Sequence, residues 1–193
     1  YSGGTGVFAG QLSLESEEGL ILSLERMDTI RAVSPEDSSL IAEAGCILSN
    51  VHDTAEAAGM LFPLSMASKG SCRIGGNLAT NAGGIQVLRY GNARDLCIGI
   101  EAVMPDGSVL NELSPLRKNN TGYDLRHLLI GSEGTLGIIT AASLSLKPAN
   151  AETVTAFCAI PSPSKAVELL QHIRSGIGES VSAIELMSGL GME

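Results

Sequence analysis

Short apolar runs bounded by turn residues predict β-strands in several parts of the chain. The runs expected to form strands in the first 112 positions are residues 20–24, 30–33, 39–44, 96–104 and 108–111. Residues 47–58 instead space their apolar side chains as on one face of a helix, and Gly59 supplies a signal for the end of that helix. Pro105, Asp106 and Gly107 separate the last two strand runs and predict a β-hairpin. This mixture of patterns indicates an α+β fold.

The third quarter of the chain ends in a break. Residues 123–129 predict one or two helical turns, and residues 138–146 predict a further strand. Residues 148–152, Pro-Ala-Asn-Ala-Glu, then have the composition of a linker. We therefore expect one domain over residues 1–148.

The pattern after the linker predicts the beginning of a second domain over residues 149–193. The elements expected there are a strand over residues 153–160, a helix over 163–173 and a strand over 181–187. Ser162 precedes the helix as a residue suited to its N-terminus. The order strand, helix, strand is typical of a second, smaller α+β domain.

Three glycine-rich segments carry the strongest chemical signal. They are residues 3–6, residues 70–84 and residues 131–137, and Ser, Thr or Asn is interleaved in each. Glycine adopts backbone angles closed to other residues and leaves room for a ligand against the backbone. Successive backbone N–H groups in a turn can bind an anion. The pattern favours a site for a phosphate or a dinucleotide, and ordinary tight turns are the alternative interpretation.

The spacing of these glycines excludes two common nucleotide motifs. A nicotinamide-dinucleotide fingerprint needs Gly-x-Gly-x-x-Gly opening a helix directly after a strand. Residues 131–137 lack that spacing and precede a strand pattern. The sequence also contains no Gly-x-x-x-x-Gly-Lys-Ser/Thr, so a P-loop is excluded. A diphosphate would therefore be held by a cradle of another type.

Charge and composition narrow the class of protein further. The net charge of −9 over 193 residues argues against nucleic acid and anionic membrane as partners. No apolar run reaches the length needed to span a membrane. The four cysteines are far apart and are expected to be isolated thiols, mostly in the core, in a reducing compartment. The three histidines show no paired spacing, so no metal site is expected within these residues.

The glycine-rich segments and the motifs around them resemble one known family. The segments that carry the resemblance are residues 3–6, 69–84, 89–91, 118–125 and 131–140. In this order they resemble the FAD-binding domain of the vanillyl-alcohol-oxidase, or PCMH-type, superfamily, and within it the branch of D-lactate, glycolate and D-2-hydroxyglutarate dehydrogenases. The likeness runs from residue 1 to about residue 148 and continues weakly to Met187. The family usually has Arg-Gly where this chain has Tyr1-Ser2.

The resemblance implies a fold and an activity. The fold is an α+β PCMH-type FAD-binding domain followed by the start of a ferredoxin-like α+β substrate or cap domain. The activity is the oxidation of a D-2-hydroxy acid by hydride transfer to FAD, with an electron acceptor that the sequence does not identify. The family places a small βαβ subdomain before the first glycine-rich segment, on which this chain begins, so we expect a fragment truncated at its N-terminus. The family's catalytic and metal-binding histidines lie beyond residue 193, so the fragment alone should be inactive and should bind FAD weakly, and any divalent metal would lie outside it.

The resemblance and the glycine pattern together predict the residues that hold FAD. Glu133 is among them as a flavin-site residue, with a solvated surface carboxylate as the alternative. The predicted cofactor-binding residues are Gly3, Gly4, Thr5, Gly6, Gly70, Ser71, Gly75, Gly76, Asn77, Thr80, Asn81, Ala82, Gly84, Glu133, Gly134, Gly137, Ile138 and Ile139. We expect the flavin to be held without a covalent bond. Cys72 should face the phosphates, and His127 should lie in the core.

Other functions remain open at the level of sequence. Another PCMH-type flavoenzyme, such as an alkyl-glycerone-phosphate synthase or a sugar oxidase, is one alternative. A non-redox module that binds a different diphosphate ligand is another. We expect the full-length protein to be cytoplasmic in a bacterium or mitochondrial in a eukaryote. The sequence does not indicate its oligomeric state.

Overall fold

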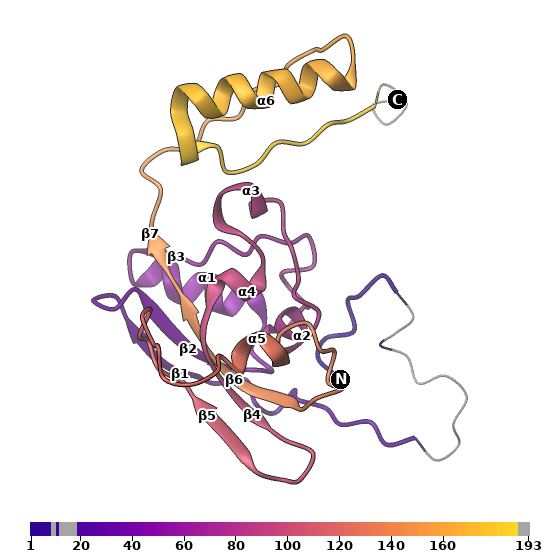
Figure 1. The fold of residues 1–193 in the computed structure, drawn as a ribbon, viewed down its shortest axis with the longest axis vertical. Helices are drawn as coiled ribbons and strands as arrows, with labels where there is room; N and C mark the ends of the chain where they lie inside the picture. The colour runs from indigo at the N-terminus through magenta and orange to yellow at the C-terminus, as the bar shows by residue number, and fades with distance from the viewer. Residues whose placement is uncertain (9–10, 12–18, 189–193) are drawn as a thin grey trace.

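A five-stranded antiparallel sheet forms the body of the molecule (Figure 1), in a computed structural model that describes residues 1–8, 11 and 19–188. Its strands, in spatial order, are β1 (Ile30–Ser34), β2 (Ser39–Glu43), β6 (Ile138–Ser145), β4 (Cys97–Val103) and β5 (Val109–Glu112). The sequence predicted each of these strands, and the structure confirms them. The hairpin between β4 and β5 is also confirmed, with Gly107 at φ +83° in its turn.

The central position of β6 follows from its composition. Small residues such as Ala141, Ala142 and Ser143 let other chain segments approach both faces of the strand, and all three are fully buried. β2 and β4 pair with β6 on its two sides. The strand therefore ties the two halves of the sheet together, and its first residues lead directly out of the third glycine-rich segment.

Helices pack against the apolar face of this sheet. The longest of them in the body is α1 (Leu48–Ala57), whose Leu48, Val51 and Ala55 are buried at helical spacing. It ends at Gly59 with φ +70°, as the sequence predicted. The shorter helices are α2 (Ile74–Ala79), α3 (Val87–Tyr90), α4 (Ala93–Leu96) and α5 (Arg126–Leu129). The buried side chains of α1, α2, α4 and α5 join those of the sheet in one core, whereas α3 has no buried residue.

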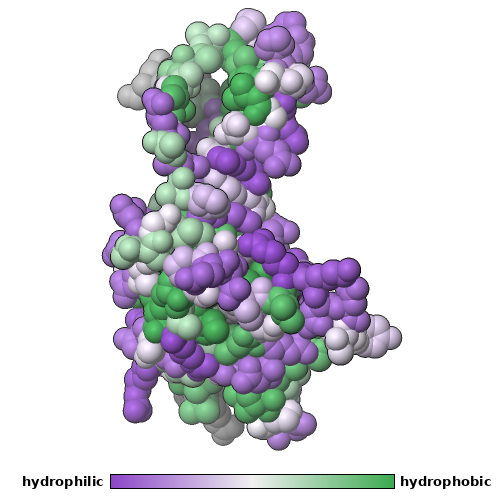
Figure 2. Space-filling view, turned by 90° about the vertical axis from the view of Figure 1, so that its left-hand side faces the viewer, coloured by the Kyte–Doolittle hydropathy of each residue, from purple (hydrophilic) through white to green (hydrophobic). Residues whose placement is uncertain are grey.

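The chain leaves this body after a second, two-stranded sheet of β3 (Met60–Leu61) and β7 (Lys147–Pro148). Beyond β7 lie the helix α6 (Pro163–Ile177) and the 3-10 turn η2 (Gly178–Ser180). Figure 1 shows α6 and its flanking segments above the sheet body, and Figure 2 shows a narrow waist between the two parts. The helix confirms the prediction over residues 163–173 and extends it to Ile177.

Three predicted strands are wrong. Residues 20–24, 153–160 and 181–187 are not strands, because none of them pairs with a strand among the described residues. A strand needs a neighbour with which to exchange backbone hydrogen bonds, and apolar character alone does not supply one. The second glycine-rich segment is also not a loop throughout, because α2 forms within it.

Candidate functional site

The second and third glycine-rich segments line one cavity of about 350 Å³ beside the sheet, and Tyr1 and Ser2, directly before the first segment, line it as well. Seven of the residues predicted to bind the cofactor line it: Gly75, Gly76, Glu133, Gly134, Gly137, Ile138 and Ile139. They come from α2, from the turn before β6 and from the start of β6. Residues as far apart in the sequence as Tyr1 and Ile139 therefore meet at one place.

The first segment lies directly against the second. Gly3 has φ +92°, and a Cβ there would stand 2.6 Å from the carbonyl oxygen of Ser71. The backbone N–H of Gly76 donates to Ser2 Oγ over 2.9 Å. Gly4 follows with φ +61°, so two successive residues adopt a backbone conformation that favours glycine. Gly6 is held by its N–H, which donates to Gln11 Oε1 at 3.0 Å.

The two adjacent glycines of α2 have different structural roles. Gly75 faces the sheet, since a Cβ there would stand 2.7 Å from Ala44 Cβ, and its N–H donates to the Ala44 carbonyl at 2.7 Å. Gly76 faces the first segment, since a Cβ there would stand 2.8 Å from the Ser2 carbonyl oxygen. Gly75 thus seats the helix on β2, and Gly76 lets the first segment approach the cavity.

The third segment docks on the C-terminal end of α2. The N–H of Gly131 donates to the Leu78 carbonyl at 3.0 Å, and that of Glu133 donates to the Ala79 carbonyl at 2.9 Å. The bond from Glu133 satisfies a carbonyl at the end of α2, and that from Gly131 adds a second donor to the Leu78 carbonyl, which also accepts from Asn81 N–H. Glu133 and Gly134 then have φ of +53° and +81°. A non-glycine residue in this region is uncommon, and such strained positions cluster at functional sites.

The other predicted residues do not line the cavity, and three of them make side-chain hydrogen bonds near it. Thr80 Oγ1 donates to the Gly76 carbonyl at 3.0 Å, and Asn81 Oδ1 accepts from the backbone N–H of Arg94 at 3.0 Å. Asn77 is buried, and its Nδ2 points to Cys72 Sγ at 3.7 Å. The predicted residues outside the described lining are Gly3, Gly4, Thr5, Gly6, Gly70, Ser71, Asn77, Thr80, Asn81, Ala82 and Gly84.

The sequence analysis missed the apolar wall of the cavity. Leu20, Ile21, Leu22 and Leu24 line it together with Tyr1 and Ser2. The segment is attached to the first residue of the chain, because Leu24 N donates to the Tyr1 carbonyl at 3.2 Å and the Tyr1 amino group donates to the Leu22 carbonyl. Leu20 is 95% exposed. The apolar run of residues 20–24 was the available signal. Its composition predicts a strand, but in the structure it forms part of the cavity wall.

The composition of this cavity suits one part of a large amphipathic ligand. One wall is aliphatic, and the residues facing it include the glycines of α2 and of the third segment, which leave the backbone accessible. Small-molecule sites span about 300–1,000 Å³, so this cavity lies at the lower end of the range. A dinucleotide with a flat ring system and a diphosphate would fit in part within it and in part along the adjoining segments.

The two side chains considered for a covalent link both lie away from this cavity. Cys72 is buried with 1% of its surface exposed, and it lines no part of the cavity in the described structure. His127 was expected in the core, and this expectation is wrong. Its side chain is 47% exposed beside Asp124, because the short helix α5 buries Leu129 instead.

Residues 1–8, 11 and 19–188 hold no group of three His, Cys, Asp or Glu side chains placed to bind a metal ion. In the same residues, no helix is both long enough and apolar enough to cross a membrane.

Comparison with known proteins gives a consistent family. A family model of the FAD binding domain matches residues 1–112. The chain is 43% identical over 185 residues to the mitochondrial D-2-hydroxyglutarate dehydrogenase of Bos taurus, covering 96% of this chain and 34% of that protein. It is 39% identical over 193 residues to the D-2-hydroxyglutarate dehydrogenase of Xanthomonas citri pv. viticola, covering 100% of this chain and 40% of that protein.

The solved structures extend the comparison to the fold. A structure of alkyldihydroxyacetonephosphate synthase superposes with a TM-score of 0.63 at 27% identity, covering 79% of this chain and 27% of that one. The agreement supports the PCMH-type fold that the sequence predicted. The chain spans about a third of the length of the first curated relatives that it matches.

Proposed function

The chain belongs to the FAD-binding domain family, and from this premise we propose that it forms the flavin-binding core of a dehydrogenase of D-2-hydroxy acids. The observation that carries the proposal is that two glycine-rich segments line one cavity with an aliphatic wall, while the first segment packs against the second beside it. Such a wall suits a ring system, and exposed glycine backbone suits a diphosphate.

The proposal assigns a part of FAD to each segment. The diphosphate lies against residues 4–6 and the segment of residues 71–84, where the missing side chain of Gly76 lets Ser2 approach α2 closely. Residues 134–139 lie near the flavin or the adenine end. Ile138 and Ile139 contribute aliphatic surface there, and Leu20 and Leu22 belong to the same lining.

The chemistry divides between cofactor and protein. Bound FAD would accept a hydride from the carbon that bears the substrate hydroxyl. The residues of this chain would bind and orient the cofactor and would exclude water with the aliphatic wall. The cavity has no histidine in its described lining, so the prediction that the proton acceptor lies outside residues 1–193 stays a prediction.

The substrate class is proposed from the relatives. Both curated relatives described above are named for D-2-hydroxyglutarate, and a further relative in Schizosaccharomyces pombe, 39% identical, is named a putative D-lactate dehydrogenase. We propose a small D-2-hydroxy acid as substrate and a separate electron acceptor.

We also propose that residues 1–148 form the second subdomain of the FAD-binding domain and that residues 149–193 begin the substrate or cap domain. The compartment would be the mitochondrion in a eukaryote and the cytoplasm in a bacterium.

The test of the proposed activity is a substrate screen on the full-length protein. D-2-hydroxyglutarate, D-lactate and glycolate are each supplied with a dye that accepts electrons from reduced flavin. We expect dye reduction with at least one of the three acids and much less with its L enantiomer, where one exists. A flavin-containing protein that reduces the dye with none of them would contradict the proposed substrate class.

The structural similarity to alkyldihydroxyacetonephosphate synthase favours a second candidate within the same superfamily. The identity is lower, 27% against 39–44% for the D-2-hydroxyglutarate dehydrogenases. A protein that binds FAD and acts on none of the hydroxy acids would favour this candidate. A full-length protein that does not bind FAD would favour the non-redox module.

A further inference from the structure

Arg94 lies where the second and third glycine-rich segments meet, and it does not belong to the described cavity lining. It sits in α4, a single turn whose start is fixed by the N–H of Asn92 donating to Asp95 Oδ2 at 2.8 Å. The backbone N–H of Arg94 donates to Asn81 Oδ1 at 3.0 Å. Asn81 follows the C-terminal end of α2 and has φ +48°. The residue is therefore anchored to the end of the second segment.

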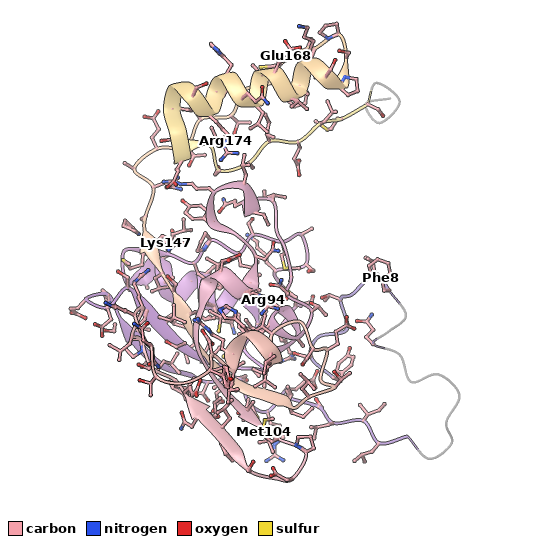
Figure 3. All side chains as sticks on the ribbon, viewed as in Figure 1. Phe8, Arg94, Met104, Lys147, Glu168 and Arg174 are labelled. Atoms are coloured by element: carbon pink, nitrogen blue, oxygen red, sulfur yellow. The ribbon has the colours of Figure 1, made fainter. Side chains whose placement is uncertain are left out.

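The guanidinium of Arg94 holds the chain that enters the third segment. Nη1 donates to the His127 carbonyl at 2.6 Å, and Nη2 donates to the Ile130 carbonyl. Figure 3 shows Arg94 in the middle of the body, between α4 and α5. These carbonyls lie in and directly after α5, where a helix end leaves oxygens without partners. The planar guanidinium of Arg94 thus donates to two of these carbonyl oxygens at once.

The chain after Ile130 leads into the cavity wall, whose lining includes Ser132. Ile130 precedes Gly131, and a Cβ on Gly131 would stand 3.1 Å from Arg94 Nη2. Three residues further on, Glu133 and Gly134 line the cavity with positive φ. Residues in such sparsely populated conformations persist only where the surrounding structure restrains them. The bonds of Gly131 and Glu133 to α2 restrain the segment from one side, and Arg94 restrains its entry.

We propose that Arg94 is a positioning residue for the FAD site, one that holds the turn of residues 131–134 so that Ser132, Glu133 and Gly134 line the cavity, without itself touching the cofactor. The inference rests on the proposed binding of FAD by this cavity. It adds a residue from outside the three glycine-rich segments and explains why α4, a helix that does not line the cavity, lies beside them.

The test measures FAD affinity and thermal stability on the full-length protein and its variants. Arg94→Ala removes both side-chain bonds, and Arg94→Lys keeps the charge but cannot reproduce the fork. Val51→Ala is the control, because it truncates a buried side chain of α1 that does not line the cavity. We expect Arg94→Ala to raise the Kd for FAD roughly tenfold or more, as loss of charge-assisted hydrogen bonds implies. Arg94→Lys should lie between it and the wild type.

A comparison at equal stability separates positioning from general destabilisation. When Arg94→Lys and Val51→Ala lower the Tm of the FAD-free protein by similar amounts, only Arg94→Lys should have a raised Kd for FAD. Millimolar guanidinium should restore FAD binding to Arg94→Ala and leave the Kd of Val51→Ala unchanged. Equal loss of affinity in Val51→Ala and the arginine variants, or unchanged affinity in both arginine variants, would overturn the inference. A wild-type protein that binds no FAD would instead refute the proposed function.

Discussion

At the scale of single residues, two glycines of one segment differ in how closely other atoms approach the position where a side chain would begin. Gly70 has no heavy atom within 4 Å of the place a Cβ would take, whereas Gly76 has the Ser2 carbonyl there at 2.8 Å. Both lie in the same glycine-rich segment, only six positions apart. The pair therefore separates a glycine that the site requires from one that it does not.

We predict that Gly76→Ala weakens FAD binding and that Gly70→Ala does not. The new methyl group on Gly76 would displace the first segment from α2 and disturb the bond from the Gly76 N–H to Ser2 Oγ. Overpacking of this kind costs about 1–3 kcal/mol, which corresponds to a Kd raised roughly 5- to 150-fold if it falls on the bound form. Titration of the full-length apoprotein with FAD, followed by flavin fluorescence, measures the Kd. Equal affinities for the two variants would contradict this assignment.

A second prediction at this scale concerns the flavin linkage. Cys72 is buried against Asn77, His127 lies beside Asp124, and neither lines the cavity, so neither side chain is placed to bond to a flavin ring there. Acid precipitation of the full-length protein should leave the flavin in the supernatant. Yellow colour that stays with the washed pellet would show a covalent link and would refute the prediction.

At the scale of elements, an ion-pair network crosses the polar side of the sheet. Arg31 on β1 contacts Glu43 on β2 at 3.1 Å and Glu101 on β4 at 2.9 Å. Thr140 Oγ1 on β6 donates to Glu101 at 2.7 Å. Ala141 of β6 pairs with both glutamates, and its small side chain lets the arginine reach across. The network joins four of the five strands.

We predict that Glu101→Gln lowers the free energy of unfolding by about 1–2 kcal/mol at neutral pH, because it removes a charge-assisted bond of a mostly buried carboxylate. The hydrogen bond from Arg31, aided by that from Thr140, holds the pKa of Glu101 below its ordinary value. A carboxylate with a lowered pKa stabilises the fold above the unfolded-state pKa, and this contribution is lost as the pH falls through the folded-state value.

The stability difference between wild type and Glu101→Gln should therefore shrink as the pH is lowered below about 4.5, the ordinary range of a glutamate. Urea denaturation at several pH values measures it. Glu56→Gln is the matched control, since Glu56 is an exposed residue of α1. A difference that does not change with pH, or one equal to that of the control, would show that the network does not stabilise the sheet.

The elements that the sequence predicted are those with strong local signals. Apolar spacing and a glycine stop gave α1, and a long apolar run gave β6. Helix α2 was missed because glycine disfavours helices by about 1 kcal/mol per residue. Tertiary packing overcomes this, since Ile74 and Leu78 are buried one turn apart and Gly75 sits against Ala44. The Ile74–Leu78 spacing was the signal for this helix.

The same reasoning explains what could be predicted of the site. Glycine content identified the segments that meet at the cavity, because it reflects close backbone approach. It could not tell which residues of a segment line the cavity and which do not. Gly76 lines it, whereas Asn81 does not and instead accepts a hydrogen bond from the backbone N–H of Arg94. Nor could it place residues 20–24 opposite them, because that contact depends on how distant parts of the chain meet in space.

At the scale of the whole molecule, the fold brings together segments from the beginning, the middle and the end of the sheet body. Figure 1 shows the N-terminus beside α2 and the turn that leads into β6. The sheet provides the fixed frame, because β2 seats α2 through Ala44 and β6 carries the third segment. The part beyond β7 lies across a waist from this body (Figure 2). The cavity therefore belongs to the sheet body alone in the described structure.

The central claim is that three glycine-rich segments bind FAD together, and hydrogen–deuterium exchange of the full-length protein with and without FAD tests it most directly. We predict that FAD slows exchange at residues 1–6, 75–79 and 132–139 in parallel, with one midpoint of FAD concentration for all three. Exchange in α1, which does not line the cavity, should not change. Slowed exchange in only one of the segments, or in none of them while FAD is bound, would contradict the claim.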